Sequence, residues 1–118
     1  MSRVTLNQAK AGAVGAWETG KEAFFAHINP RTLEVTRPIS APGAGANRKH
    51  PIAVSNSKSE TLFAWTEGTG WAKGGSLAWQ IYDASDKPEL EKGRAEGVPM
   101  WSLITAFAKP DRGFVLVY

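Results

Sequence analysis

An internal repeat constrains the fold of this 118-residue chain more than any other feature of its sequence. Residues 2–17 (SRVTLNQAKAGAVGAW) align without a gap with residues 50–65 (HPIAVSNSKSETLFAW), at an offset of 48 that places Trp17 on Trp65. Residues 103–118 (LITAFAKPDRGFVLVY) align with the second copy at an offset of 53. Because such periods are typical of solenoids, propellers and arrays, the repeated unit has to explain the whole fold.

Each copy has the pattern of a β-hairpin. An apolar run is followed by a short turn of Lys, Ser, Pro, Asp or Gly and by a second apolar run rich in β-branched and aromatic residues. A further pair of strands follows the first two copies, since FFAHINPRTLEV from Phe24 aligns with LAWQIYDASDKPEL from Leu77. The last strand of each unit is the more charged, which is typical of a covered sheet whose outermost strand meets water. The sequence therefore predicts two units of four strands and a half unit of two.

This pattern predicts an all-β fold, namely a β-propeller fragment of about two and a half four-stranded blades. Blade 1 is expected at residues 1–49, blade 2 at residues 50–102 and a half blade at residues 103–118, together forming one domain. The segment most helix-like by composition, DKPELEKGRAEG, contains Pro88 and Gly93, and no stretch keeps a helical apolar period. We therefore expect little helix.

Composition excludes several classes of function. The chain has no cysteine, which excludes a disulfide framework and a thiol nucleophile. Its net charge of +3 comes from 14 Lys and Arg interspersed with 11 Asp and Glu, without the basic stripe typical of nucleic-acid binding. No apolar run has the length of a signal peptide or a membrane span. We expect a soluble chain with neither nucleic acid nor membrane as partner, and the sequence leaves the localisation open.

The second unit and the last hairpin also carry a family resemblance. NRKHPIAVSNSKSETLFAWTEGTGWAKGGSLAWQIYD and GVPMWSLITAFAKPDRGFVLVY resemble the C-terminal blades of sialidase-like (BNR-type) bacterial β-propeller proteins, especially uncharacterised exported ones of planctomycete type. The resemblance implies a propeller fold and an exported parent protein. The Asp-box of many sialidases, Ser-x-Asp-x-Gly-x-x-Trp, is matched by neither SLAWQIYD nor FFAHINP, which argues against sialidase activity.

A glycine-rich segment lengthens one connection of the second unit. Eleven residues, TEGTGWAKGGS, separate Trp65 from Leu77, whereas six, ETGKEA, separate Trp17 from Phe24. The loop between the second and third strands is therefore five residues longer than in the first unit, and glycine supplies the positive φ of tight turns. The segment matches neither the dinucleotide fingerprint nor the P-loop and precedes a strand, which argues against phosphate binding. A structural hairpin and a binding loop both stay open.

The meander topology predicts which distant residues share one end of the molecule. Connections between second and third strands emerge at the same end as connections between blades, so Trp71 and Lys73 are expected beside residues 47–50 and 93–102. The predicted ligand-binding residues are Arg48, His50, Trp71, Lys73, Arg94 and Trp101. Aromatic planes interleaved with cationic donors suit sugars and anionic groups, so the expected ligand is a saccharide. The tryptophans inside predicted strands are assigned to the core, namely Trp17, Trp65 and Trp79.

The sequence singles out no catalytic residue. His27 lies within a predicted strand and His50 precedes Pro51, without metal-ligand spacing, so neither a metal nor a cofactor is expected. Three carboxylates stand at predicted strand ends, where they can face a pocket, namely Glu18, Glu67 and Asp83, but nothing marks two of them as a glycosidase pair. Two functions stay open: a non-catalytic binding or structural scaffold, which we favour, and a sialidase-like glycan hydrolase or part of one.

Ten predicted strands are too few to close a propeller of about four to eight blades. The first hairpin (RVTLNQ) and the last (GFVLVY) would expose unpaired backbone groups and apolar faces, which favour pairing with another copy. We expect a homo-oligomer that closes by β-strand contact, a dimer first and a trimer as the alternative. Because the chain starts at a unit boundary and stops half a unit later, we also expect a piece of a longer propeller, either a natural short protein or an engineered fragment.

Overall fold

The computed structural model describes residues 4–43 and 47–118, which form ten strands and no helix. The first sheet has the order β1 (Val4–Ala9), β2 (Gly12–Thr19), β3 (Glu22–Ile28), β4 (Ile39–Ser40). The second has the order β5 (Arg48–Ser55), β6 (Thr61–Glu67), β7 (Gly75–Tyr82), β8 (Pro88–Val98), and the third pairs β9 (Thr105–Ala108) with β10 (Phe114–Val117). All pairs are antiparallel. The all-β prediction is confirmed, with the expected grouping of four, four and two strands. Ser2 and Arg3, which open the first copy of the repeat, lie outside the described residues.

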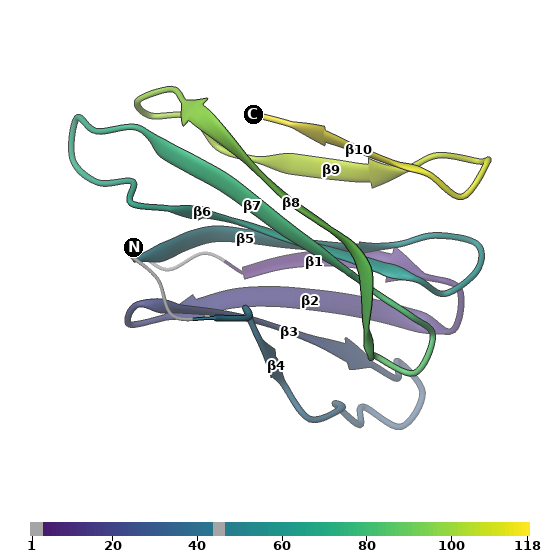
Figure 1. Ribbon diagram of the computed structural model, residues 1–118. Coiled ribbons are helices and arrows are strands. Elements are labelled where there is room, and N and C mark those ends of the chain that lie inside the picture. The colour runs from purple at the N-terminus through teal and green to yellow at the C-terminus, as the bar shows by residue number, and fades with distance from the viewer. Residues whose placement is uncertain (1–3, 44–46) are drawn as a thin grey trace.

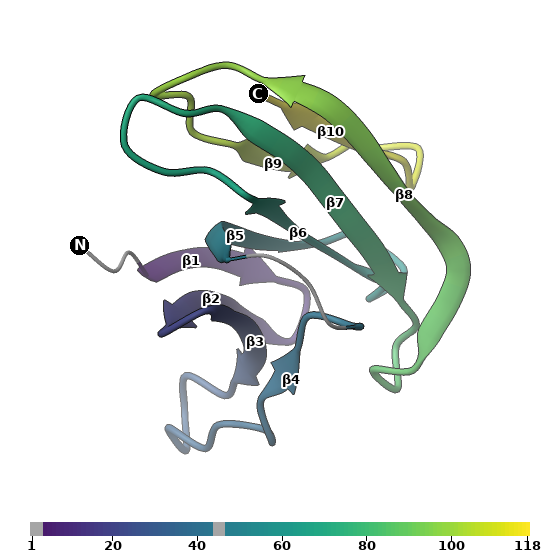
Figure 2. The ribbon, with the colours of Figure 1, turned by 60° about the vertical axis from the view of Figure 1, so that its left-hand side comes forward.

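The three sheets stack face to face, with the second sheet in the middle (Figures 1 and 2). Side chains alternate between the two faces of a strand, so the second sheet contributes to two cores. The first core, between the first and second sheets, contains among others Val14, Ala16, Phe25, Phe63, Trp65 and Tyr82. The second core, between the second and third sheets, contains among others Ile52, Leu62, Ala64, Leu77, Ile104 and Ala106. Burial on both faces explains why every residue of β6 is buried and why its sequence is nearly continuously apolar.

The register of the hairpins reproduces the repeat with one difference. Ile52 lies opposite Ala64, and Thr105 lies opposite Val117, so the second and third hairpins share a register at the offset of 53. In the first hairpin Val4 lies opposite Trp17, which is one residue out of step with the offset of 48. The cause is the turn, because the first hairpin reverses through residues 10–11 and the other two reverse through longer turns.

The outer strands of the two complete sheets differ in length. In the second sheet β8 runs over 11 residues from Pro88 to Val98, so most of the segment DKPELEKGRAEG is strand and not helix. Residues 93–98, which the sequence places in the connection to the next unit, belong to this strand, because it continues to pair with β7 as far as Val98. In the first sheet β4 has only two residues, and Val35, within the expected fourth strand, forms an isolated bridge to Ile28. Pro38, between Val35 and β4, explains the interruption, because proline has no N–H to donate to a sheet.

The first strands of successive sheets contact one another. The Thr5 hydroxyl donates to the Pro51 carbonyl (3.2 Å), and the Asn7 amide donates to the Ala53 carbonyl (2.9 Å), which joins β1 to β5. Strand β5 in turn contacts β9. The outer strands β4 and β8 lie well apart, so the sheets fan out from β1, β5 and β9 (Figure 2).

Both ends of this stack leave apolar side chains exposed. On the first sheet Val4 is 70% exposed and Leu6 64%, and on the third sheet Phe107 is 53% exposed and Val117 49%. Val4, Leu6 and Phe107 alternate with buried or half-buried neighbours along β1 and β9, so they stand on the sheet faces that point away from the stack. Val117 on β10 lies opposite Thr105, two residues from Phe107, and therefore shares the face of Phe107. We refer to these two surfaces, defined by Val4 and Leu6 and by Phe107 and Val117, as the end faces.

Candidate binding site

The loop between β6 and β7 covers residues 68–74, whereas the equivalent connection between β2 and β3 covers only residues 20–21. The predicted lengthening by five residues is therefore confirmed. Gly70 and Lys73 exchange two backbone hydrogen bonds of 3.2 Å, which makes Trp71 and Ala72 the tip of a tight turn. Trp71 consequently stands out from the molecule and is 86% exposed.

A second tryptophan reaches this tip from the connection between β8 and β9. Ser102 donates its backbone N–H to the Pro99 carbonyl (3.2 Å), and Trp101 has a φ of 64° within this turn. The ring centroids of Trp71 and Trp101 lie 4.8 Å apart at an interplanar angle of 87°, an edge-to-face contact. The two loops therefore present a pair of indole rings at the surface, as the topology predicted.

Below the indoles lies a buried carboxylate at the end of β2. The Glu18 side chain is 4% exposed and accepts hydrogen bonds from the Lys49 ammonium (3.4 Å) and the His50 backbone N–H (2.8 Å). His50 has a φ of 51° at an irregularity in the pairing of β5 with β6, and its Nδ1 lies 3.1 Å from the Thr66 hydroxyl oxygen. Since Pro51 has no N–H to donate to β6, the ladder of hydrogen bonds between β5 and β6 is interrupted here. The His50 N–H is therefore donated to the Glu18 carboxylate and not to β6.

These segments enclose a pocket of about 310 Å³, a volume at the lower end of those typical of small-molecule sites. We call it the Trp71 pocket. Its lining residues are Glu18, Lys49, His50, Thr69, Gly70, Trp71, Lys73, Pro99, Trp101, Ser102 and Leu103. Four of the six predicted ligand-binding residues, His50, Trp71, Lys73 and Trp101, therefore come together.

Arg48 lies outside the pocket and is buried between the first and second sheets. Its guanidinium donates to the Glu22 carboxylate (2.8 Å) and to the carbonyls of Ala41 (3.0 Å), Pro42 (2.7 Å) and Gly43 (2.8 Å). Its side chain is only 2% exposed. Arg48 therefore fastens residues 41–43 to the start of β5 and is not open to a ligand.

Arg94 also lies outside the pocket, in a charged network on the outer half of the second sheet. It donates to the carboxylates of Glu67 (2.6 Å) and Glu96 (2.9 Å) and to the Ser76 hydroxyl. Burial of Glu67 opposes its ionisation, but hydrogen bonds from Arg94 and Trp65 outweigh burial, so the pKa of Glu67 lies below its usual value. The Glu67 hydrogen bond is also the main cause of the raised pKa of Arg94.

The structure adds lining residues that the sequence did not single out, namely Lys49, Thr69, Gly70, Pro99, Ser102 and Leu103. Most of them belong to loops already expected at this end of the molecule, so loop membership was the available signal. The sequence marks Glu18 as a strand-end carboxylate that can face a pocket, and it lines the Trp71 pocket. Its role as the acceptor of the His50 N–H follows from the interrupted ladder, which the repeat does not reveal.

The Trp71 pocket combines two indole rings, two lysines and a carboxylate. Of its lining residues Glu18 alone carries a carboxylate, whereas glycoside hydrolysis generally uses a pair. Among residues 4–43 and 47–118, no three His, Asp or Glu side chains are placed to hold a metal ion. The same residues contain no helix long and apolar enough to cross a membrane. Comparison of the chain with protein-family models, curated proteins and solved structures finds no match.

Proposed function

We propose that this chain is a β-propeller fragment that acts as a non-catalytic binding scaffold, and that the Trp71 pocket binds a saccharide carrying an anionic group. The observation that carries this proposal is the exposed pair of Trp71 and Trp101 beside two lysines. Indole rings offer large, rigid apolar surfaces to the C–H faces of a sugar ring, and ammonium groups bind carboxylates. An exposed aromatic pair contributes little to the core, so its value to the molecule lies in contact with something else.

The balance of charge favours an acidic sugar over a neutral one. Lys49 is already paired with the buried Glu18 carboxylate. The Lys73 side chain is exposed, and its ammonium has no ion-pair partner in the part of the chain that the structure describes. A carboxylate on the ligand would supply that partner.

The propeller proposal rests on the internal repeat, on the stack of four-, four- and two-stranded sheets, and on their fanning out from β1, β5 and β9. The resemblance to sialidase-like propeller proteins supports it further. We propose that copies associate through the end faces, as a dimer first and a trimer as the alternative, because these faces are apolar and exposed.

The test of the saccharide site is a calorimetric titration with glucose, glucuronic acid and N-acetylneuraminic acid, repeated with variants. Trp71→Ala and Trp101→Ala should each weaken binding of the acidic sugars by more than about tenfold, while the melting temperature stays unchanged because both side chains are exposed. Lys73→Ala should weaken binding of the acidic sugars and spare glucose. Leu90→Ala is the matched control, since Leu90 is 96% exposed on β8 and outside the pocket.

Two results would contradict this proposal. A melting temperature lowered by several degrees in Trp71→Ala would mean that Trp71 packs and does not bind. Turnover of fluorogenic glycosides by the wild-type chain would favour the glycan hydrolase over the scaffold.

A further inference from the structure

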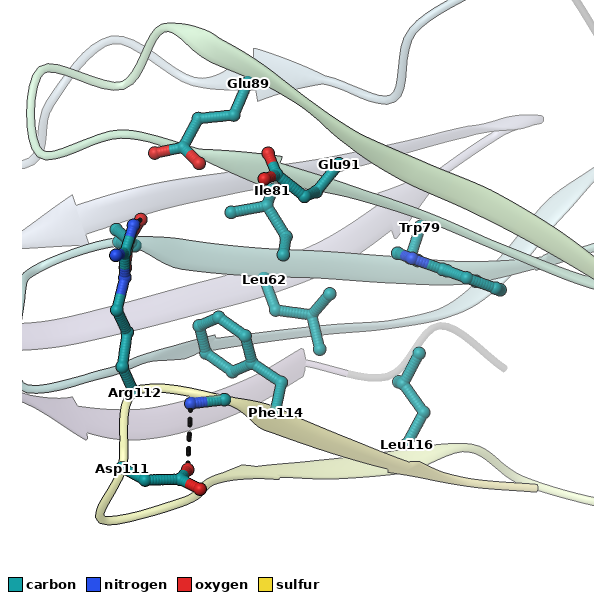
Figure 3. A pocket seen from close by; sticks show the side chains of 11 residues that line it. Leu62, Trp79, Ile81, Glu89, Glu91, Asp111, Arg112, Phe114 and Leu116 are labelled. Atoms are coloured by element: carbon teal, nitrogen blue, oxygen red, sulfur yellow. Dashed lines mark hydrogen bonds and ion pairs between the residues drawn. The ribbon is translucent and has the colours of Figure 1, made fainter.

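A second, larger cavity lies between the second and third sheets and shares no residue with the Trp71 pocket. It has a volume of about 490 Å³. Figure 3 shows an apolar floor formed by Leu62, Trp79, Ile81, Phe114 and Leu116. The charged rim consists of Glu60, Glu89, Glu91, Asp111 and Arg112. We call this cavity the β10 groove.

One border of the β10 groove is a strand edge that no described strand pairs. Among the strands of residues 4–43 and 47–118, β10 is hydrogen-bonded to β9 alone. Lys109 donates its backbone N–H to the Gly113 carbonyl (2.7 Å), so these two residues form a hydrogen-bonded pair of the ladder. Because such pairs alternate along an antiparallel ladder, Phe114 and Leu116 direct their backbone N–H and C=O groups away from β9. The groove therefore has hydrogen-bonding backbone beside an apolar floor, the combination that an added strand uses.

The registers of the two complete sheets identify equivalent positions on their third strands. Phe24 on β3 lies opposite Trp17, and Ala78 on β7 lies opposite Trp65, the repeat equivalent of Trp17. Phe25 follows Phe24 and Trp79 follows Ala78, and since side chains alternate along a strand, each points to the opposite face of its sheet, towards the next sheet. Phe25 and Trp79 are therefore equivalent, and both face the sheet that comes after their own.

These equivalent residues have different environments. Phe25 is completely buried, and the ring of Tyr82, on the third strand of the following sheet, lies 4.9 Å from it. The sheet that follows Trp79 has only two strands, so no third strand covers the indole, which is partly exposed. The contact between the first and second sheets, where β7 covers Phe25 with Tyr82, thus shows what fits in the β10 groove. It is an extended strand with an apolar side chain directed at the floor.

The rim of the groove adds a requirement of charge. Glu60 is held by Arg112 through bonds of 2.5 and 2.6 Å, and Asp111 is held by Lys109 at 3.0 Å. Glu89 and Glu91 have no basic partner within salt-bridge distance in the described structure. Burial and the neighbouring carboxylates of Glu60 and Glu91 raise the pKa of Glu89. A lysine or arginine of an incoming strand would relieve this repulsion.

We infer that the β10 groove accepts an extended cationic strand of a partner protein, which pairs antiparallel with β10, seats an apolar side chain on Trp79 and Ile81, and directs Lys or Arg to Glu89 and Glu91. This is β-strand addition, in which backbone hydrogen bonds give affinity and alternate side chains give specificity. The inference does not depend on the saccharide proposal, because it rests on other residues.

The first test uses a nine-residue peptide with a fluorescein label and an amidated carboxyl end. The peptide alternates threonine with the groove-facing series valine, tyrosine, lysine, lysine, which places the lysines at the acidic end of the groove when the strands are antiparallel. The matched control replaces both lysines by glutamate. Fluorescence anisotropy with the full chain should show at least about tenfold tighter binding of the cationic peptide, and Glu91→Lys should reduce this preference.

The second test addresses the strand edge. Leu116→Ala and Leu116→Pro both shorten the side chain, but only proline removes the N–H that Leu116 directs to the free edge. Leu116→Pro should bind the cationic peptide about tenfold more weakly than Leu116→Ala. Circular dichroism of both variants checks that the sheets persist, and Glu91→Lys, which leaves the β10 backbone intact, keeps the inference testable if Leu116→Pro does not fold.

Three results would overturn the inference. They are no binding of the cationic peptide, equal binding of the two peptides, and equal binding by the two Leu116 variants when both are folded. Trp71→Ala should bind the peptide as the wild-type chain does, so a failure of the saccharide proposal stays distinguishable from a failure of this one.

Discussion

Arg112, in the turn between β9 and β10, holds Glu60, in the turn between β5 and β6, through a two-point ion pair with distances of 2.5 Å (Nε–Oε1) and 2.6 Å (Nη2–Oε2). The Asn56 amide donates at 2.8 Å both to the Glu60 carboxylate and to the Arg112 carbonyl. These contacts connect the second sheet to the two-stranded third sheet. The attachment of the third sheet therefore depends partly on an ionised carboxylate.

This ion pair predicts a dependence of stability on acid. Hydrogen bonds from Arg112 and Asn56 lower the pKa of Glu60 from 4.5 to about 2. A carboxylate whose pKa is lower in the folded state stabilises the fold fully above pH 4.5, and this contribution is lost as the pH falls from 4.5 towards 2. The melting temperature should fall over this window by less in Arg112→Gln than in the wild-type chain. Melting curves between pH 2 and 7 measure this, and parallel pH profiles of the two proteins would contradict it.

A second prediction concerns the ring of Trp79, which lies across the backbone of Gly93 on the neighbouring strand. A Cβ atom at Gly93 would stand 2.2 Å from Cζ2 of the indole, so Gly93→Ala has to displace the ring. Overpacking of this kind costs about 1–3 kcal/mol of unfolding free energy. Urea unfolding followed by tryptophan fluorescence measures both the loss and the change in environment of the indole. Gly70→Ala is the control, because nothing lies within 4 Å of its added Cβ, and an equal loss there would contradict the steric explanation.

A third prediction concerns the buried guanidinium of Arg48. Arg48→Ala removes a hydrogen bond to Glu22 and leaves the carbonyls of residues 41–43 without their donor. We expect a loss of about 3 kcal/mol or more in unfolding free energy, measured by urea denaturation. Arg31→Ala, at an exposed position, should change it by less than about 0.5 kcal/mol. Similar values for both variants would mean that Arg48 does not fasten residues 41–43.

A fourth prediction follows from the proposed association through the end faces. Leu6→Lys and Phe107→Lys each place a charge on one end face, so either variant should sediment as a monomer while its far-ultraviolet circular dichroism stays that of the wild-type chain. Leu90→Lys, at a 96% exposed position on β8, should leave the oligomer intact. A wild-type chain that is monomeric at micromolar concentration would exclude the proposed association.

The sequence predicted the strand grouping and the meeting of Trp71 with Trp101, because both depend on the order and length of segments. In a meander the order of strands decides at which end each loop emerges, and the count between Trp65 and Leu77 gave the loop its correct extra length. No side-chain direction was needed for either prediction. This is why the loop residues of the Trp71 pocket were largely found.

The direction of side chains was harder to predict, as Arg48 shows. Adjacent residues of a strand point to opposite faces, so the inward direction of Arg48 depends on the register of β5 with β6. That register is irregular between Lys49 and Ile52, and the hairpin turns set it differently in the first and second units. The internal repeat does not contain this information.

The β10 groove was missed for a different reason. The sequence assigns Trp79 to the core because it lies inside a predicted strand, where tryptophan normally packs. The indole does lie against the second core, but the two strands of the third sheet do not extend over it. Burial at this position is decided by a strand that the neighbouring sheet does not have, and not by the residues around Trp79 in the sequence.

The shared register of the second and third hairpins has a consequence for how such a chain changes its length. Ile52 with Ala64 and Thr105 with Val117 meet at one constant spacing, so the pairing within these two hairpins recurs at equivalent positions. Duplication or deletion of one whole unit in the gene preserves that pairing, whereas a change in a hairpin turn moves one strand against the other, as the first hairpin illustrates. A change of length by a whole unit therefore keeps the strand register of every remaining hairpin.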